Sequence, residues 1–221
     1  MLIDRFQKLK KDLLANEFSY GKYWESAKTT FEIDFNENGY QNLGSRDYFP
    51  KLFDKNINLD HHQILDKKEN LKVIEIGSRS FVLEKEGYTN DTLLYSLDHL
   101  KKISDKINTN DTVCEVGAGS GILTGLIHNK KKTKNIIIDI PNVILCSISF
   151  LFTVFPNKNF LLPNEIDDNL KIKDYDFIFL TPDQKNLVLD EEIDLGINTF
   201  SFMEMDYQEI EEYLGFFQKK I

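Results

Sequence analysis

Two kinds of apolar segment alternate along the second half of the chain. Short and almost continuous apolar runs occur at 112–116, 135–140, 176–180 and 193–198. Longer segments with apolar residues three or four positions apart occur at 92–107, 122–129, 141–155 and 206–220. The short runs are typical of buried parallel strands, and the longer segments are typical of helices that cover them. We therefore predict an α/β fold with a Rossmann-like, doubly wound parallel sheet.

Signals at the ends of the helical segments support these boundaries. Residues 89–91 (TND) offer side-chain oxygens that cap the helix at 92–107. Pro141 stands at the first turn of the next long helix, where proline is favoured. The closing helix at 206–220 is expected to turn four residues inward, namely Ile210, Tyr213, Leu214 and Phe217.

The order of the later strands leaves one alternative open. The apolar run at 159–162 could be the third strand, which would make 176–180 the fourth. We prefer 176–180 as the third strand and 193–198 as the fourth, because the segment between them is too short for a regular crossover helix.

The first 70 residues lack this alternation. A short strand is expected at 71–76, and the spacing within 1–18 puts four apolar residues on one helix face, Leu2, Phe6, Leu9 and Leu13. Residues 19–70 hold many aromatic side chains without a sustained period, so we expect short helices and loops there. Such a segment fits a small helical subdomain, a cap or an oligomer surface. We therefore divide the chain into a mainly helical cap at 1–70 and an α/β domain at 71–221. Assembly of the chain into a homo-oligomer stays an open alternative.

Two stretches look alike as candidate ligand-binding loops, VIEIGSRS at 73–80 and VCEVGAGSG at 113–121. A loop that brings its backbone close to a ligand needs glycine, because a side chain obstructs the approach. The second stretch supplies Gly117, Gly119 and Gly121 around Ala118, and an apolar-faced helix follows it. In the first stretch Arg79 stands where Gly119 stands in the second. We therefore predict that 113–121 is the cofactor loop.

Two acids accompany this loop. Glu115 stands two residues before the first glycine, and Asp139 ends the next strand about 20 residues later, where a carboxylate commonly binds both ribose hydroxyls. The spacing G-x-G-x-G departs from the G-x-G-x-x-G of dinucleotide sites, since Ile122 takes the place of the third glycine.

A carboxylate beside the loop disfavours a pyrophosphate and favours a ligand that carries an ammonium group. S-adenosylmethionine (AdoMet) has such a group and no phosphate, so AdoMet is the cofactor we expect. In the alternative interpretation, the glycines only permit tight packing and Asp139 only caps the helix that follows.

VCEVGAGSG and IIIDIP resemble the first motif and the ribose-binding second strand of class I AdoMet-dependent methyltransferases. IDLGINTFSFMEM at 193–205, with the Asp139–Ile140–Pro141 step, is similar to a family of sugar O-methyltransferases, and the resemblance spans 71–214. It implies an enzyme that transfers a methyl group from AdoMet to a hydroxyl of a sugar or glycan precursor, with a sugar or nucleotide-sugar acceptor. It also implies seven strands, so we expect the last strands to be missing and the domain to be C-terminally incomplete.

Reacting groups of open α/β sheets gather beyond the carboxyl ends of the strands, which points to the loop after 193–198. We expect Asn198 to hold the methionine or adenosine part of AdoMet and Ser201 to contact the acceptor. Glu204 is the candidate general base or acceptor-hydroxyl contact, although it would also suit the N-terminus of the closing helix. Arg79 is expected to reach the AdoMet carboxylate or a nucleotide-sugar phosphate, or else to be an exposed hairpin residue.

Composition bears on the classes of partner and on the compartment that we expect for this chain. A net charge of −9 argues against binding to a nucleic-acid backbone. The apolar stretch at 143–155 is shorter than the ~20 residues that span a bilayer. Cys114 and Cys146 have neither metal-type nor disulfide spacing, which suits a reducing compartment, and the cytoplasm is the simplest location.

The histidines predict no metal site. The adjacent pair His61–His62 has no third spaced ligand, so a solvated loop is the preferred interpretation. His99 and His128 are interpreted as structural or solvated, although His99 is placed where it could reach a cleft. Three alternative functions stay open: methylation of another small molecule, a non-catalytic or truncated AdoMet-binding fragment, and a nucleotide-binding oxidoreductase.

Overall fold

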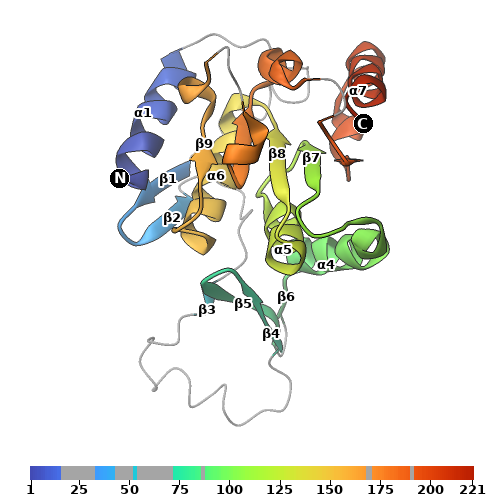
Figure 1. Cartoon of the computed structure of the whole chain (residues 1–221). Coiled ribbons are helices and arrows are strands. Elements are labelled where there is room, and N and C mark those ends of the chain that lie inside the picture. The colour runs from blue at the N-terminus through green and yellow to red at the C-terminus, as the bar shows by residue number, and fades with distance from the viewer. Residues whose placement is uncertain (16–32, 43–51, 54–71, 86–87, 168–170, 190–191) are drawn as a thin grey trace, which may run out of the picture.

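The computed structural model of the 221-residue chain describes residues 1–15, 33–42, 52–53, 72–85, 88–167, 171–189 and 192–221 (Figure 1). The expectations for 16–32, 43–51 and 54–71 lie outside the described residues, and these include the pair His61–His62.

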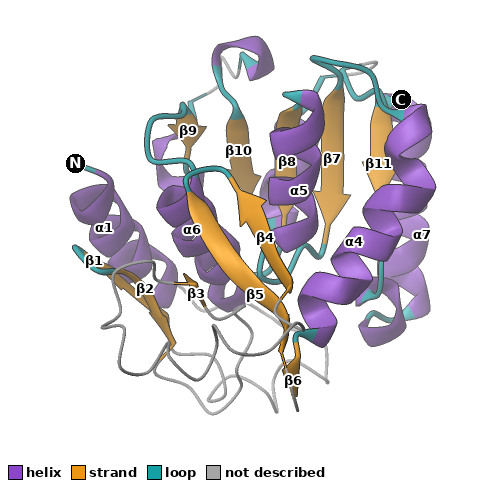
Figure 2. Cartoon of the chain, turned by 90° about the horizontal axis from the view of Figure 1, so that it is seen from below, coloured by secondary structure: helices purple, strands orange, loops and turns teal. Residues whose placement is uncertain are grey.

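A five-stranded parallel sheet forms the centre of the fold (Figure 2). Its strands are β7 (Thr112–Val116), β8 (Lys134–Ile138), β9 (Phe160–Leu161), β10 (Phe177–Leu180) and β11 (Leu195–Ile197). They lie in the order β11-β7-β8-β10-β9, and every pairing is parallel. The predicted α/β fold with a parallel sheet is therefore confirmed, and its helices are those of a Rossmann-like arrangement.

The preferred order of the later strands is confirmed. Strand β10 pairs with β8 and strand β11 pairs with β7, while β9 adds an outer strand beside β10. The chain crosses from β10 to β11 through only a short 3-10 helix, η5 (Pro182–Leu187), as its length requires. Sheet growth therefore reverses direction between β7 and β11, and the carboxyl ends of strands at such a switch point commonly bind ligands.

Helices cover both faces of the sheet. On one face lie α4 (Asp91–Ile103), which continues as η2 (Ser104–Lys106), α5 (Ile122–Lys131) and α6 (Pro141–Val154). On the other face lies α7 (Tyr207–Lys220). Three short 3-10 helices lie between the strands or before α7, namely η3 (Pro163–Glu165), η4 (Ile172–Asp174) and η6 (Ser201–Glu204). No helix among the described residues combines the length and apolar character that crossing a membrane requires.

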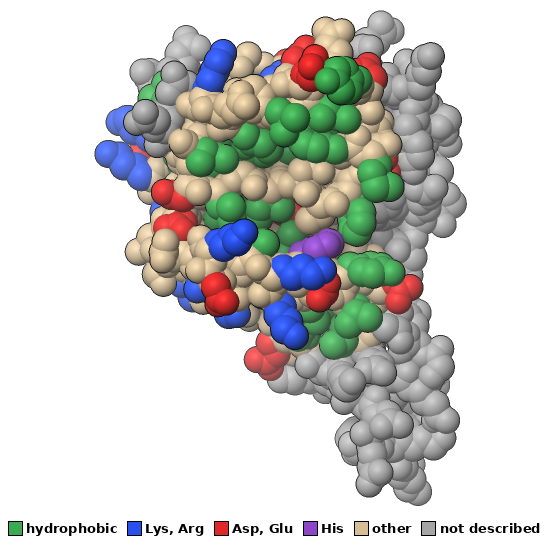
Figure 3. Space-filling model, turned by 90° about the vertical axis from the view of Figure 1, so that its right-hand side faces the viewer, with side chains coloured by type: hydrophobic (Ala, Val, Ile, Leu, Met, Phe, Trp, Pro, Cys, Tyr) green, Lys and Arg blue, Asp and Glu red, His purple; other side chains and the backbone are tan. Residues whose placement is uncertain are grey.

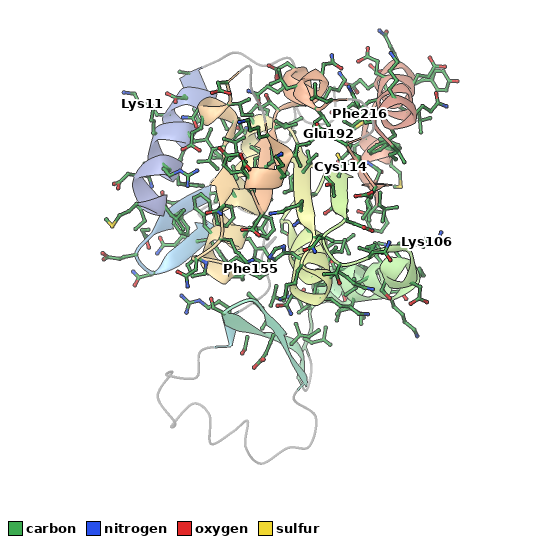
Figure 4. The ribbon with its side chains drawn as sticks, viewed as in Figure 1. Lys11, Lys106, Cys114, Phe155, Glu192 and Phe216 are labelled. Atoms are coloured by element: carbon green, nitrogen blue, oxygen red, sulfur yellow. The ribbon has the colours of Figure 1, made fainter. Side chains whose placement is uncertain are left out.

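Successive strand residues supply two separate cores, as the two-residue period of a strand requires. Val113, Ile137 and Phe179 pack in the cluster that includes α5 and α6. Cys114, Ile136 and Ile178 pack in the other cluster, whose helical members include Tyr213 and Phe216 of α7. Figure 4 labels Cys114 and Phe216 from this second cluster and Phe155 from the first.

The cap expected for α4 within residues 89–91 is present, and α7 is capped as well, but the inward face expected for α7 is wrong at one residue. Asn90 accepts a hydrogen bond from the Leu93 amide at 2.9 Å, and Asp206 accepts one from the Glu209 amide at 2.9 Å. The prediction that Leu214 points inward is wrong, because Leu214 is 49% exposed. The helix instead buries a line of residues three or four positions apart, Tyr213, Phe216 and Lys220.

The N-terminal segment is less helical than predicted where it is described. Helix α1 (Leu2–Ala15) buries Phe6, Leu9 and Leu13, as expected. The hairpin of β1 (Ile33–Asn36) and β2 (Gly39–Asn42), by contrast, was not expected, nor was β3 (Leu52–Phe53). The hairpin packs on α6, and the ring centroids of Phe35 and Phe152 are 5.6 Å apart. A mainly helical cap is therefore wrong for these residues, because Ile33 and Phe35 alternate with polar neighbours at the period of a strand.

VIEIGSRS forms a turn between antiparallel strands, not a strand followed by a helix. Strand β4 (Lys72–Ile76) pairs with β5 (Arg79–Lys85), which also pairs with β3 and with β6 (Tyr88–Thr89). Gly77 adopts a φ of +57°, and a Cβ there would overlap the Val154 carbonyl and the Phe155 ring. The glycine of this stretch therefore serves close packing against the C-terminal end of α6.

Candidate functional site

A cavity of about 410 Å³ opens between α4 and α7, over the carboxyl ends of β7 and β8. Residues of α4, of the loops after β7, β8 and β11, of η5 and of α7 make its wall. Figure 3 shows the face that carries α4 and α7, where hydrophobic side chains gather in several clusters and a histidine is visible among them. This volume is within the range of small-molecule sites.

The predicted cofactor loop lies in this wall, and its three glycines serve different purposes. All three have positive φ, +72° for Gly117, +59° for Gly119 and +75° for Gly121. A Cβ at Gly117 would overlap the Ser201 side chain, and one at Gly121 would lie 2.9 Å from the Ser147 Cβ. A Cβ at Gly119 would meet no protein atom within 4 Å. Gly117 and Gly121 therefore allow tight packing, whereas Gly119 leaves open space beside the cavity.

Glu115 lies in the cavity wall and is only 2% exposed. The Thr124 hydroxyl of α5 donates a hydrogen bond to its Oε2 at 2.5 Å. The pKa of Glu115 is raised to about 7, chiefly by burial and also by the charge of Asp139, against the opposing effect of the Thr124 hydrogen bond. A buried carboxyl with so high a pKa gains from a cation that pairs with its charged form.

Asp139 lies beside it, directly after β8, and is 8% exposed. Its Oδ2 accepts a hydrogen bond from the Gly119 amide at 2.9 Å, and its Oδ1 accepts one from the Ile140 amide at 2.8 Å. Burial raises the pKa of Asp139 to about 7, although these two amides favour the charged form. Each oxygen keeps a further lone pair, so the carboxylate can still accept hydrogen bonds from two hydroxyl groups.

The loop after β11 reaches the same cavity, but Asn198 does not line it. The Asn198 amide donates to the Val116 carbonyl at 3.0 Å and to the Ser201 hydroxyl at 2.5 Å, and its Oδ1 accepts from the Phe202 amide at 3.3 Å. Asn198 therefore ties this loop to the end of β7. It holds the loop in position and does not itself line the cavity. Ser201 and Glu204 do line the cavity.

The structure does not bring Arg79 to the cavity. Arg79 is exposed and begins β5, beside the turn that packs on Val154 at the C-terminal end of α6. The cavity lies at the opposite end of α6, where Ile140 and Val143 form part of its wall. The hypothesis that Arg79 contacts the cofactor or a nucleotide-sugar phosphate is withdrawn, because a helix of 14 residues separates the two places.

Four residues of the wall come from α4 and were not predicted as site residues: Thr92, Tyr95, Ser96 and His99. Their spacing of three or four positions places them on one helix face, but the spacing alone does not show that this face meets a cavity. His99 therefore does reach the cleft. His128, by contrast, is a buried structural residue whose Nδ1 lies 2.8 Å from the Thr133 carbonyl, and burial lowers its pKa to about 4.

Carboxylates dominate the charge of the wall. Five acids line it, Glu115, Asp139, Glu204, Glu209 and Glu212. Among the described residues of the wall, Lys185 is the only lysine or arginine, and its Nζ lies 3.4 Å from Glu212 and 5.6 Å from the Tyr213 ring centroid. Within the described ranges, no group of three or more histidine, cysteine, aspartate or glutamate residues could hold a metal ion. The wall therefore favours a cationic ligand over a phosphate.

Comparison with known proteins gives no relative for this chain. No family model matches it, and neither a curated protein nor a solved structure matches it. The residues and the geometry of the cavity are therefore the basis for assigning a function.

Proposed function

We propose that the protein is an AdoMet-dependent O-methyltransferase that acts on a hydroxyl of a sugar or glycan precursor. One observation carries the proposal: the buried acids Glu115 and Asp139 lie at the ends of adjacent strands, on either side of a glycine loop with open space at Gly119. A ligand with a diol, a cation and no phosphate satisfies both acids.

The sheet supports the same proposal at the level of the fold. Strands β10, β8, β7 and β11 occupy the third, second, first and fourth places of a doubly wound sheet. The class I methyltransferase type is one member of this architecture, and the resemblance of VCEVGAGSG and IIIDIP to that superfamily favours it. A shared fold alone would not identify the reaction, so the choice depends on the acids of the site.

Three residues of the wall have a defined part in holding AdoMet in this proposal. Asp139 accepts hydrogen bonds from the ribose hydroxyls, Glu115 provides negative charge for the ammonium group, and Gly119 lets the ligand approach the loop backbone. The bound cofactor supplies a methyl group that its positive sulfur already activates. The chain must then orient the acceptor hydroxyl and accept its proton. The cavity offers two acceptors for that proton, the Glu204 carboxylate and the His99 imidazole.

A nicotinamide dinucleotide fits the wall less well. Its pyrophosphate would lie against the glycine loop, where Glu115 and Asp139 are buried and Glu204 is close enough to raise the pKa of Asp139. Above about pH 7, where the Glu115 and Asp139 carboxyls lose their protons, three acids at this place repel a doubly charged group. An oxidoreductase is therefore disfavoured on electrostatic grounds.

The proposal is tested by incubating the whole chain with methyl-tritiated AdoMet and a panel of nucleotide sugars and methyl glycosides. We expect protein-dependent transfer of label to a hydroxyl of at least one member. Failure of the chain to bind AdoMet would contradict the proposal. Binding of AdoMet without transfer to any member would instead support the alternative of a non-catalytic AdoMet-binding fragment.

A further inference from the structure

The cavity has two chemically different walls. The five acids come from β7, from the loops after β8 and β11, and from α7. The α4 wall consists of Thr92, Tyr95, Ser96 and His99 and contains no carboxylate. An acidic wall suits the cationic cofactor, and a wall of hydroxyl, aromatic and imidazole groups suits a neutral ligand that carries hydroxyl groups.

An aromatic cluster stands at the edge of the α4 wall. The Phe200 ring from the loop after β11 lies 5.5 Å from the His99 ring and 6.4 Å from the Tyr95 ring, centroid to centroid. Tyr95 is 57% exposed and Phe200 is 53% exposed, although both line the cavity. Two large rings left half open to solvent at a cavity mouth provide an apolar surface that a flat or ring-shaped ligand can cover.

The two candidate proton acceptors, Glu204 and His99, belong to different walls of the cavity. Glu204 lies close enough to Asp139 for its charge to raise the pKa of that carboxyl, which places Glu204 with the acids of the cofactor wall. His99 lies on α4 and contacts Phe200. His99 is the only histidine that the described part of the chain contributes to the wall, and imidazole is the side chain most often used to accept a proton in catalysis.

We propose that α4 and Phe200 form the acceptor subsite and that His99 is the general base. The ring of a neutral sugar lies against Tyr95 and Phe200 with one hydroxyl directed at the His99 imidazole. The acceptor O–H bond breaks as its proton passes to a ring nitrogen of His99. The oxygen electron pair forms the new O–CH₃ bond, and the electron pair of the broken C–S bond returns to sulfur. This assignment rests on the proposed methyltransferase function and adds the place and chemistry of its acceptor.

The subsite is tested first by binding, with S-adenosylhomocysteine in place of the donor. Saturation-transfer NMR is recorded with methyl α-D-glucopyranoside and methyl α-L-rhamnopyranoside on the wild type and on Phe200→Ala. We expect signals from the ring protons of at least one glycoside with the wild type and their loss in the variant. A wild type that binds S-adenosylhomocysteine but gives no signal with either glycoside overturns the subsite. A wild type that does not bind S-adenosylhomocysteine overturns the proposed function instead.

The role of His99 is tested by transfer of label from AdoMet to the glycoside that binds. We expect His99→Asn to lower kcat by about 100-fold or more, since general-base catalysis contributes that much, while calorimetry shows an unchanged Kd for S-adenosylhomocysteine. Asp98→Asn, at the neighbouring exposed position of α4, is the matched control and should keep the wild-type kcat. The role of His99 as general base is overturned if His99→Asn keeps the kcat of the wild type. It is also overturned if the wild type binds the glycoside but transfers no methyl group to it. A loss confined to Glu204→Gln assigns the base to Glu204.

Discussion

The backbone amide of Gly119 donates a hydrogen bond to the carboxylate of Asp139, with 2.9 Å between N and Oδ2. The bond joins the glycine loop that follows β7 to the first residue after β8. The same carboxylate accepts from the Ile140 amide, so one side chain fixes the ends of two strands at the cavity. Asp139 therefore links the glycine loop to the end of β8, and this link limits the ordering that ligand binding must impose.

Asp139→Asn should weaken binding of S-adenosylhomocysteine by about 10- to 100-fold, the equivalent of a lost hydrogen bond to a charged group. The new amide can offer only one accepting oxygen, so its NH₂ group would face one of the two amide donors, Gly119 or Ile140. Calorimetric titration measures the change. Asp183→Asn, at an exposed position outside the cavity wall, is the control, and equal affinities in the two variants would contradict the role of Asp139.

The raised pKa values of Glu115 and Asp139 make stability fall as pH rises. Both carboxyls keep their protons in the folded chain up to about pH 7, whereas in the unfolded chain they release them at an ordinary pKa of about 4. The folded state therefore binds more protons between these limits. Its stability decreases from about pH 4 to pH 7 through these groups and changes little above that range.

Glu115→Gln should therefore stabilise the free protein at pH 8 by about 1–3 kcal/mol, because it removes a buried charge. The glutamine oxygen can still accept the Thr124 hydrogen bond. The same variant should weaken AdoMet binding, since it removes the negative charge that we propose for the ammonium group. Urea unfolding at pH 5 and pH 8 checks the first effect, with exposed Glu211→Gln as control. A Glu115→Gln variant less stable than the wild type at pH 8 would argue against a buried charge.

Two glycines with open space beside them should respond to alanine in opposite ways. A Cβ at Gly119 or at Gly215 meets no protein atom within 4 Å. Gly215 lies within α7, so Gly215→Ala should stabilise the protein by up to about 1 kcal/mol. Gly119 has a φ of +59° and lines the cavity, so Gly119→Ala should cost about 1–2 kcal/mol and weaken S-adenosylhomocysteine binding at least tenfold. Thermal unfolding and calorimetry measure both, and unchanged affinity in Gly119→Ala would show that the ligand does not approach this loop.

Gly77→Ala should destabilise the fold without changing ligand affinity. A Cβ at Gly77 overlaps the Val154 carbonyl and the Phe155 ring, and the φ of +57° is also unfavourable for alanine. We expect a loss of about 2–4 kcal/mol, the usual range for overpacking with backbone strain. The exposed neighbour Arg79→Ala should change stability little. A higher Kd for S-adenosylhomocysteine in the folded fraction of either variant would link the β4–β5 turn to the site.

The sequence predicted the parallel sheet and the wall of the site that follows its strands. The glycine loop, Glu115 and Asp139 could be located because strand, turn and acid occur at fixed spacings in this architecture. The two similar stretches, 73–80 and 113–121, differ in structural role for a physical reason. Gly119 leaves space at a cavity, while Gly77 lets a turn pack on α6. Ser201 and Glu204 line the cavity as expected, because both follow the strand that lies beside β7.

Other features depended on contacts between distant segments that local patterns do not specify. Asn198 follows β11 as predicted, but its amide groups bond to Val116 and Ser201 in place of lining the cavity. Arg79 failed as a site residue because the antiparallel pairing of β4 with β5 carries it to the far end of α6. The α4 wall was missed since its spacing resembles any amphipathic helix until the fold shows which face meets the cavity.

The central claim is that the cavity selects a cationic adenosyl ligand through buried acids. Calorimetric titration of the wild-type chain with AdoMet, S-adenosylhomocysteine and NAD at pH 8 tests it most directly. We predict saturable binding of AdoMet and S-adenosylhomocysteine at one site per chain, weakened in Asp139→Asn, and no measurable binding of NAD. Binding of NAD in preference to AdoMet, or no heat from either adenosyl ligand, would contradict it.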